Sequence, residues 1–467
     1  MSSDDNNEMR QLAQRFEEAE VQGQTLYLDA DKYADLADWY ATQNNYGKAF
    51  EAIECGISIH PGNNELFTEQ AYLYLDNKNT EKAGDVIRKH LTNDNSAEVK
   101  ILKATYCFQT KDYQEAENLI ESIEDKDDLP NIIDATYLYL DMDMPEKAAV
   151  WIERGRGQYD DNTSFLSLVA DYDIYQKRYT EAIDLLNRLL DQDPYSPSYW
   201  YNLGRCHFEL GEYDKAIEAC DYALVSDEEY ADAILMKGHA FLQLENGDEA
   251  IACYKSVQKL QTVEDRYTDT FIGLAYVAKE DWNNALIYLQ TALSENAGDT
   301  QASSIIYANA ALCLHKQGRI AEAHMYLDKA IALTPDLVDC YTIGGRICLD
   351  ENNPSKAINY FKKALQLSPY ADTWFEIGNY LLEAGELQEV AFIYENIKKL
   401  EPDFDRIDER LALIYLLLED WPNFETHNRL CRNPISEEEQ QYITDFMART
   451  DGQGLPALIK DIINKLK

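Results

Sequence analysis

Apolar and polar residues recur along the chain with the period of an α-helix, and the helical stretches come in pairs. In the segment 197–230, Trp200, Leu203, Gly204 and His207 fall at i, i+3, i+4 and i+7 and therefore share one helical face. Gly211 stands where a glycine commonly ends a helix, and a second stretch of the same period starts at Tyr213. The pattern predicts a helix–turn–helix unit of 34 residues.

The unit is repeated through most of the chain. A small residue of the second helix recurs at intervals of 32 to 35 residues, with one interval of 38. Val390 and Phe424 take the same place in two degenerate copies, and the other ten positions are Ala49, Ala83, Ala116, Ala148, Ala182, Ala216, Ala250, Ala285, Ala323 and Ala357. The sequence therefore predicts an all-α protein of twelve stacked helix pairs. Its 20 glycines and 12 prolines agree with few tight turns.

The repeat resembles the tetratricopeptide repeat family. Trp200 and Trp374 match the large residue of that family's first helix, and Leu203 with Gly204 match its Leu-Gly pair. Prolines close several copies, as in the family: Pro61, Pro194, Pro335, Pro369 and Pro402. The resemblance covers about residues 30–438 and implies a right-handed superhelical solenoid with a concave wall. The acidic, tyrosine-rich style also resembles cytoplasmic repeat proteins of the Bacteroidetes.

Four regions are expected along the chain. They are an N-terminal tail and capping helix (1–29), repeats 1–8 (30–299), repeats 9–12 (300–438) and C-terminal capping helices (439–467). Residues 1–7 are polar, and we expect them to be disordered, with one helix over 8–22. The interval of 38 marks an insertion at 294–303, which is either a longer loop that could act as a hinge or one extra turn of the following helix.

Two helical patterns follow the last repeat, at about 436–449 and 455–467. The second has a strong apolar stripe flanked by lysines. It is interpreted either as a solvating cap over the last repeat or as a docking helix for a partner, a membrane surface or a second copy of the chain.

Charge and cysteine content limit the partners and the compartment. The chain has 85 acidic and 42 basic residues, a net charge of −43, which disfavours nucleic acid and anionic membranes. The longest apolar run, Leu411 to Leu418, is far shorter than the roughly 20 residues that span a bilayer. The first residues lack the features of a secretory signal, and the nine cysteines contain no Cys-x-x-Cys pair. We therefore expect buried, reduced thiols in a cytoplasmic protein without stable membrane insertion.

The sequence contains no recognisable catalytic or cofactor motif. It has no Gly-Lys-Ser or Gly-Lys-Thr phosphate loop and no His-Glu-x-x-His helix, and its seven histidines are scattered. We expect no enzyme activity, no cofactor and no bound metal. The two-carboxylate clamp by which some family members hold chaperone tails is rejected, because no copy has the lysine that it requires at the fifth position of the first helix.

The remaining candidate is the concave wall, where the family places first-helix residues at the second, fifth, ninth and twelfth positions. The resemblance implies a partner-binding groove that contains Asp31, Asp38, Glu65, Tyr72, Glu98, Phe108, Tyr137, Asp171, Tyr201, Arg205, His239, Arg346 and Asn379. Because its first half is acidic with interleaved aromatics, we expect an interaction scaffold or assembly chaperone that binds a basic, aromatic protein segment. The alternative is a regulatory repeat protein that controls a signalling or cell-envelope enzyme.

Overall fold

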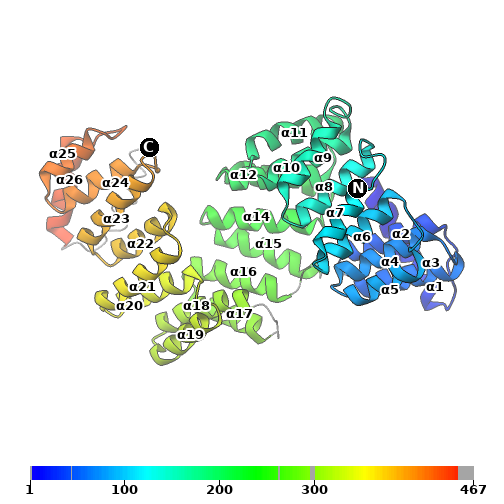
Figure 1. Cartoon of the computed structure of the whole chain (residues 1–467). Helices are drawn as coiled ribbons and strands as arrows, with labels where there is room; N and C mark the ends of the chain where they lie inside the picture. The colour runs from blue at the N-terminus through cyan, green and yellow to red at the C-terminus, as the bar shows by residue number, and fades with distance from the viewer. Residues whose placement is uncertain (1–2, 44, 261–262, 264, 295–299, 451–467) are drawn as a thin grey trace. The chain divides into compact units, whose positions relative to one another are not determined.

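The computed structural model describes residues 3–450 apart from 44, 261–262, 264 and 295–299, and within that part the chain forms 26 helices and no strand (Figure 1). The expectation of an all-α fold is confirmed. Helices α2 to α25 form twelve consecutive pairs, and α1 and α26 flank them. No described helix is both long and apolar enough to cross a membrane.

The helices divide into two compact units, Met1–Glu264 and Asp265–Lys467. The first unit contains α1 (Ser3–Val21), α2 (Ala30–Thr42), α3 (Tyr46–Ile59), α4 (Asn64–Asp76), α5 (Thr80–His90), α6 (Ala97–Gln109), α7 (Tyr113–Glu121), α8 (Leu129–Asp141), α9 (Pro145–Gly155), α10 (Thr163–Tyr175), α11 (Tyr179–Gln192), α12 (Pro197–Glu209), α13 (Tyr213–Ser226), α14 (Ala231–Gln243) and α15 (Gly247–Leu260). The second contains α16 (Asp265–Ala278), α17 (Trp282–Ser294), α18 (Thr300–Lys316), α19 (Ile320–Leu333), α20 (Val338–Asp350), α21 (Pro354–Leu367), α22 (Ala371–Glu383), α23 (Leu387–Leu400), α24 (Ile407–Leu417), α25 (Trp421–Asn428) and α26 (Glu437–Thr450).

The small residue of each second helix lies where the two helices of a pair cross. The ten alanines at this position are all 0% exposed, and Val390 and Phe424 are buried in the degenerate copies. Opposite Ala216, a Cβ on Gly204 would lie 3.2 Å from the carbonyl oxygen of Ala216. The close approach of the two helices explains why the sequence repeats small residues at this interval.

The turn inside each pair uses one residue with a left-handed backbone. Eleven turns have a positive φ at the equivalent position, and the twelfth falls at residue 44, outside the described part. Only Gly211, Gly318 and Gly385 meet this requirement with a glycine; the other eight positions are Lys78, Lys111, Asp143, Lys177, Glu245, Glu280, Asn352 and Glu419. Most repeats therefore accept a conformation that L side chains rarely adopt.

First helices form an inner row in each unit. In the first unit α2 packs on α4, α4 on α6, α6 on α8 and α8 on α10, and in the second unit α18 packs on α20 and α20 on α22. Second helices instead pack on the first helix of the following pair, as α3 does on α4 and α13 on α14. The more closely packed row of first helices therefore lines the concave side of the stack.

Several boundaries differ from the expected ones. Helix α1 already begins at Ser3, so the prediction of a disordered tail over 1–7 is wrong for residues 3–7. Near the insertion at 294–303, helix α18 has 17 residues, whereas the equivalent helix α20 has 13. The additional length of α18 is the extra helical turn that was one of the two expectations. Whether a hinge is also present concerns residues 295–299, outside the described part. The two units separate at 264/265, inside the region expected to hold repeats 1–8.

The last described helix and the cysteines are as the sequence predicts. Helix α26 matches the pattern predicted at 436–449, whereas 455–467 lies outside the described residues. All nine cysteines are free thiols, and six of them are buried, as expected.

Candidate functional site

The inner row of the first unit presents six carboxylates on four consecutive first helices. We call this surface the acidic wall, and its members are Asp38 on α2, Glu69 and Asp76 on α4, Glu98 on α6, and Asp134 and Asp141 on α8. Glu69 is half-buried and the other five are exposed. The repeat spacing therefore brings residues more than 100 positions apart in sequence onto one surface.

None of the six carboxylates has a hydrogen bond or an ion pair among the described residues. Elsewhere in the same unit carboxylates do find cations: Glu20 and Glu51 pair with Lys48, and Asp173 pairs with Arg178. The wall is therefore an uncompensated concentration of negative charge, which focuses the electrostatic potential of a concave surface.

The wall carboxylates repel one another. Burial, together with the negative charges of Asp38, Asp76 and Glu98, raises the pKa of Glu69 to about 8. The pKa values of the other five are also above their usual range, chiefly through loss of hydration. The ionised wall is thus electrostatically unfavourable in the free protein, and a cation placed against it would relieve that penalty.

Two tyrosines lie among these charges. Tyr72 on α4 is half-buried, and burial together with the charges of Asp134 and Glu98 raises its pKa. Tyr137 on α8 is 37% exposed. Both rings add apolar, hydrogen-bonding surface to the wall.

The acidic wall ends at Asp171 on α10. This carboxylate accepts hydrogen bonds from Tyr137 Oη at 2.6 Å and from Asn202 Nδ2 at 3.3 Å. Burial raises its pKa, whereas the hydrogen bond of Tyr137 and the guanidinium of Arg205 lower it. Asp171 is therefore compensated by its neighbours on α8 and α12, unlike the six wall carboxylates.

Other predicted groove residues of the first unit have different surroundings. Asp31 and Glu65 are exposed in the first turns of α2 and α4, and Glu65 repels Glu98. Phe108 is only 4% exposed and packs with Tyr139 in the core, so its expected place on the groove is wrong.

Farther along the first unit, two predicted groove residues contact tyrosines. The ring of Tyr201 makes an edge contact with Tyr230 at 5.9 Å. His239 Nδ1 lies 2.9 Å from Tyr254 Oη, and burial lowers the pKa of His239 to about 4. His239 is consequently neutral near pH 7 and adds no charge to the surface.

Arg346 and Asn379 belong to the second unit. The guanidinium of Arg346 stacks over Tyr380 at 5.2 Å and is 3.7 Å from Glu383, while its Nε is buried without a hydrogen-bond partner in the described part of the chain. Asn379 is half-buried on α22. The predicted groove residues therefore belong to two different units.

Sequence reasoning missed four of the six wall carboxylates: Glu69, Asp76, Asp134 and Asp141. They occupy the sixth and thirteenth positions of their helices, whereas the expected stripe used the fifth and twelfth. A separation of seven residues puts Glu69 and Asp76, like Asp134 and Asp141, two turns apart on one face. That repeated spacing was the available signal.

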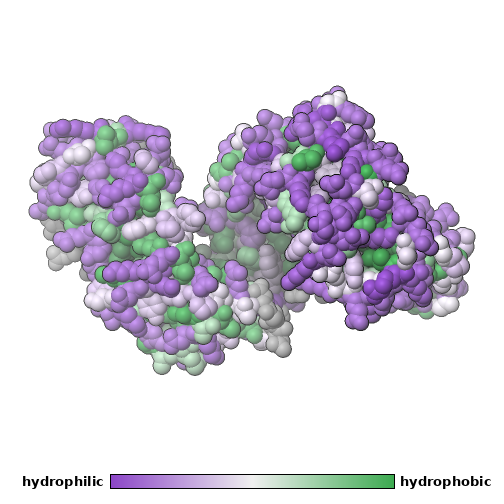
Figure 2. Space-filling model, viewed as in Figure 1, coloured by the Kyte–Doolittle hydropathy of each residue, from purple (hydrophilic) through white to green (hydrophobic). Residues whose placement is uncertain are grey.

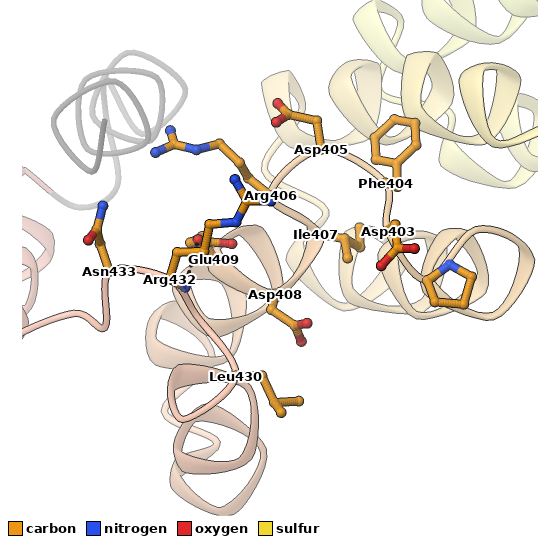
Figure 3. Close-up of a pocket in the computed structure, with 11 residues that line it drawn as sticks. Asp403, Phe404, Asp405, Arg406, Ile407, Asp408, Glu409, Leu430, Arg432 and Asn433 are labelled. Carbon is orange, nitrogen blue, oxygen red and sulfur yellow. Dashed lines mark hydrogen bonds between the residues drawn. The ribbon is translucent and has the colours of Figure 1, made fainter.

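The second unit contains a polar pocket of about 440 Å³ between the loop before α24 and the loop after α25 (Figure 3). Two of its carboxylates are already engaged: Asp408 binds Lys398 at 2.5 Å and His427 at 2.7 Å, and the buried Glu409 accepts a hydrogen bond from the backbone N–H of Arg432. These contacts tie α23, α24 and α25 together. In the part of the chain that the structure describes, no three His, Cys, Asp or Glu residues are placed to hold a metal ion.

Comparison with protein families agrees with the repeat architecture. Family models described as tetratricopeptide repeat match residues 170–234 and 272–337, and 231–262 and 339–370. A model described as anaphase-promoting complex, cyclosome, subunit 3 matches residues 42–123. The chain is a tetratricopeptide repeat protein.

This repeat protein is similar to parts of several longer proteins. It is 26% identical to Protein CTR9 homolog of Arabidopsis thaliana over 55% of this chain and 21% of that protein. It is 24% identical to Superkiller complex protein 3 of Homo sapiens over 65% and 20%, and 22% identical to Hsp70-Hsp90 organizing protein 3 of Arabidopsis thaliana over 42% and 40%. The chain thus matches about one fifth to two fifths of the length of these relatives.

Among solved structures, a tetratricopeptide repeat protein from Parabacteroides merdae is similar with a TM-score of 0.44 and 19% identity, over 51% of this chain and 93% of that one. The APC/C hetero-tetramer Cut9-Hcn1 has a TM-score of 0.38 and 16% identity, over 89% and 94%.

Proposed function

We propose that this protein is a non-enzymatic interaction scaffold or assembly chaperone, and that the acidic wall of its first unit binds a basic segment of a partner protein. The observation that carries the proposal is the set of six carboxylates without a cation among the described residues. Lysine or arginine side chains of a partner would supply the missing counter-charges.

The tyrosines of the wall suggest how such a segment would be held. Charge complementarity mainly speeds association, whereas buried aromatic contacts usually supply most of the affinity. Tyr72, between the carboxylates of α4, α6 and α8, is placed to contact an apolar or aromatic side chain next to a basic one. The proposed ligand is therefore a segment in which basic and apolar residues alternate.

The cysteines support a cytoplasmic setting for this function. Burial raises the pKa of Cys206, Cys220 and Cys313 to about 12, so these thiols are inert core residues that need no pairing.

The test is binding of a fluorescent synthetic peptide of alternating lysine, leucine and tryptophan residues to the full chain. We expect the double variant Glu98→Gln, Asp134→Asn to bind at least about tenfold more weakly, because each lost charge pair costs on the order of 1 kcal/mol. We also expect the association rate of the wild-type chain to fall as salt is raised above about 0.15 M.

A matched control removes the same two charges from second helices. Asp184 on α11 and Glu218 on α13 are both exposed, so the variant Asp184→Asn, Glu218→Gln has the same net charge without changing the wall. Equal weakening by both double variants would show that only the overall charge attracts the peptide. Binding that neither variant changes would refute the acidic wall as the site.

A further inference from the structure

The second unit has an apolar pocket of about 480 Å³ formed by α21, α22 and α23. Its floor consists of core side chains that are at most 5% exposed: Phe361, Ile377, Leu381 and Ile393. Trp374 and Phe392 stand beside this floor with ring centroids 6.3 Å apart. The pocket is large enough for one or two bulky apolar side chains.

Phe392, which lines the pocket, is unusually exposed to solvent. It is 64% exposed, although phenylalanine is commonly buried. Figure 2 shows hydrophobic residues gathered around α22 and α23 between hydrophilic ones. Apolar surface concentrated at a pocket in this way marks a site of interaction more often than isolated exposed residues do.

The α21 edge of the pocket is basic. Helix α21 contains three lysines and no acidic residue, and no other described helix has two or more lysine or arginine residues without an acid. Lys362 lines the pocket and Lys363 is the next residue of α21; both are exposed without an ion pair among the described residues, whereas the α23 side of the pocket contributes Glu389. In a chain with a net charge of −43, this edge is a local exception.

The shape of the pocket fits a helix. Helices α21 and α23 both pack on α22, which lies between them, and each has 14 residues, a length of about 21 Å. A helix laid between them would present apolar residues at i, i+3 or i+4 and i+7 to the pocket. Carboxylates beside those anchors would meet the two lysines.

We propose that this pocket docks an amphipathic helix of a partner protein, which inserts a bulky apolar side chain beside Trp374 and Phe392 and sets acidic residues against Lys362 and Lys363. The partner is thus opposite in charge to the segment proposed for the acidic wall. The two surfaces make independent contributions to a scaffold.

Two synthetic helical peptides test this on the full chain. They share one apolar face of leucines with a photoreactive benzoylphenylalanine as central anchor, and they have either glutamates or lysines along both edges. Glutamates on both edges make the outcome independent of the direction in which the helix lies. We expect the acidic peptide to cross-link to residues 358–393 at about tenfold lower concentration than the basic peptide, although the net charge of the chain favours the basic one.

Variants identify the groups responsible. We expect Lys362→Glu with Lys363→Glu to reverse the preference at this pocket, and Phe392→Ser to weaken both peptides while Phe392→Leu restores them. The matched control is Lys78→Glu with Lys177→Glu, which makes the same change of charge at two exposed turns of the first unit. If Phe392→Ser disturbs folding, the exposed lysine pair still tests the proposal.

Three results would overturn it. Cross-links outside 358–393 would place the peptide elsewhere, and a preference for the basic peptide at the pocket would refute the charge match. Binding of the acidic peptide only after Leu458→Ser with Ile462→Ser would show that the chain's own last residues occupy the pocket. A dimer that Phe392→Ser dissociates would assign the pocket to a second copy. None of these results bears on the acidic wall.

Discussion

The hydroxyl of Tyr137 on α8 donates a hydrogen bond of 2.6 Å to the carboxylate of Asp171 on α10, and so joins the fourth repeat to the fifth. Asn202 of α12 donates a second hydrogen bond to Asp171, so the charge of this carboxylate is shared with protein donors. The bond marks the end of the acidic wall.

We expect Tyr137→Phe to lower the free energy of unfolding of the first unit by about 1 kcal/mol, because a half-buried carboxylate loses a charge-assisted donor. Urea denaturation measures the change, and hydrogen exchange should show it mainly in α8 and α10. Because Tyr137 is 37% exposed, water replaces part of the bond and keeps the loss small. An unchanged midpoint would mean that water replaces the bond completely.

The sequence predicts the structural features that depend on contacts within one repeat, and it predicts less well those that depend on packing between repeats. The interval between the alanines predicted the helix pairs correctly, because Ala49 and its equivalents are selected by a local contact between two helices of one repeat. Because this contact recurs in every copy, the small residue recurs in the sequence at the interval of the repeat.

The composition of the wall depends instead on how each first helix is rotated in the stack. Phe108, at the twelfth position of α6, is buried, whereas Asp76 and Asp141, at the thirteenth positions of α4 and α8, face the inner surface. A shift of one residue rotates a side chain by about 100°. That rotation is set by packing between repeats, so the family's positions identified the correct helices but only some of the residues.

Glu69 predicts how stability depends on pH. Its pKa is raised on folding from an ordinary 4.5 to about 8, so its contribution to stability is fully present below pH 4.5 and is lost as the pH rises towards 8. We expect Glu69→Gln to be about 1 to 2 kcal/mol more stable than the wild-type chain at pH 8, where water still screens part of the repulsion, and to lose this advantage near pH 4.5. Urea denaturation at the two pH values measures it, with Asp184→Asn on α11 as the control. A constant difference at both values would contradict the assignment.

The left-handed turn residues predict stabilising substitutions. Lys111 has a φ of 67° at the position where Gly211 has 74°. Because a side chain destabilises this conformation, Lys111→Gly should raise the free energy of unfolding of the first unit by about 0.5 to 1 kcal/mol, and Gly211→Lys should lower it by a similar amount. Thermal denaturation of both variants checks the pair. Shifts of the same sign would show that the backbone angle is not the cause.

Substitution of the glycines at helix crossings should destabilise the protein to different extents, according to the space around each glycine. A Cβ on Gly345 would lie 2.1 Å from Cε1 of the buried Phe361, whereas one on Gly204 would lie 3.2 Å from its nearest neighbours. We therefore expect Gly345→Ala to cost about 2 to 3 kcal/mol, Gly204→Ala less than about 1, and Gly204→Leu about 1 to 3. Because repeats couple mainly to their neighbours, hydrogen exchange should increase around α20 and α21 for Gly345→Ala and around α12 and α13 for Gly204→Leu. Loosening confined to distant repeats would contradict the stacking.

The thiols provide a test of the packing that needs no substitution. Six cysteines are buried, and burial raises the pKa of Cys340 and Cys431 to about 12, as it does for Cys206, Cys220 and Cys313. Because the thiolate is the reactive form, these groups are both inaccessible and almost fully protonated at pH 8. Titration with a disulfide reagent should label no more than the three half-buried cysteines, Cys55, Cys107 and Cys253, within minutes in the native protein. All nine should react in denaturant, and any excess of fast native labelling would locate a repeat that opens on that timescale.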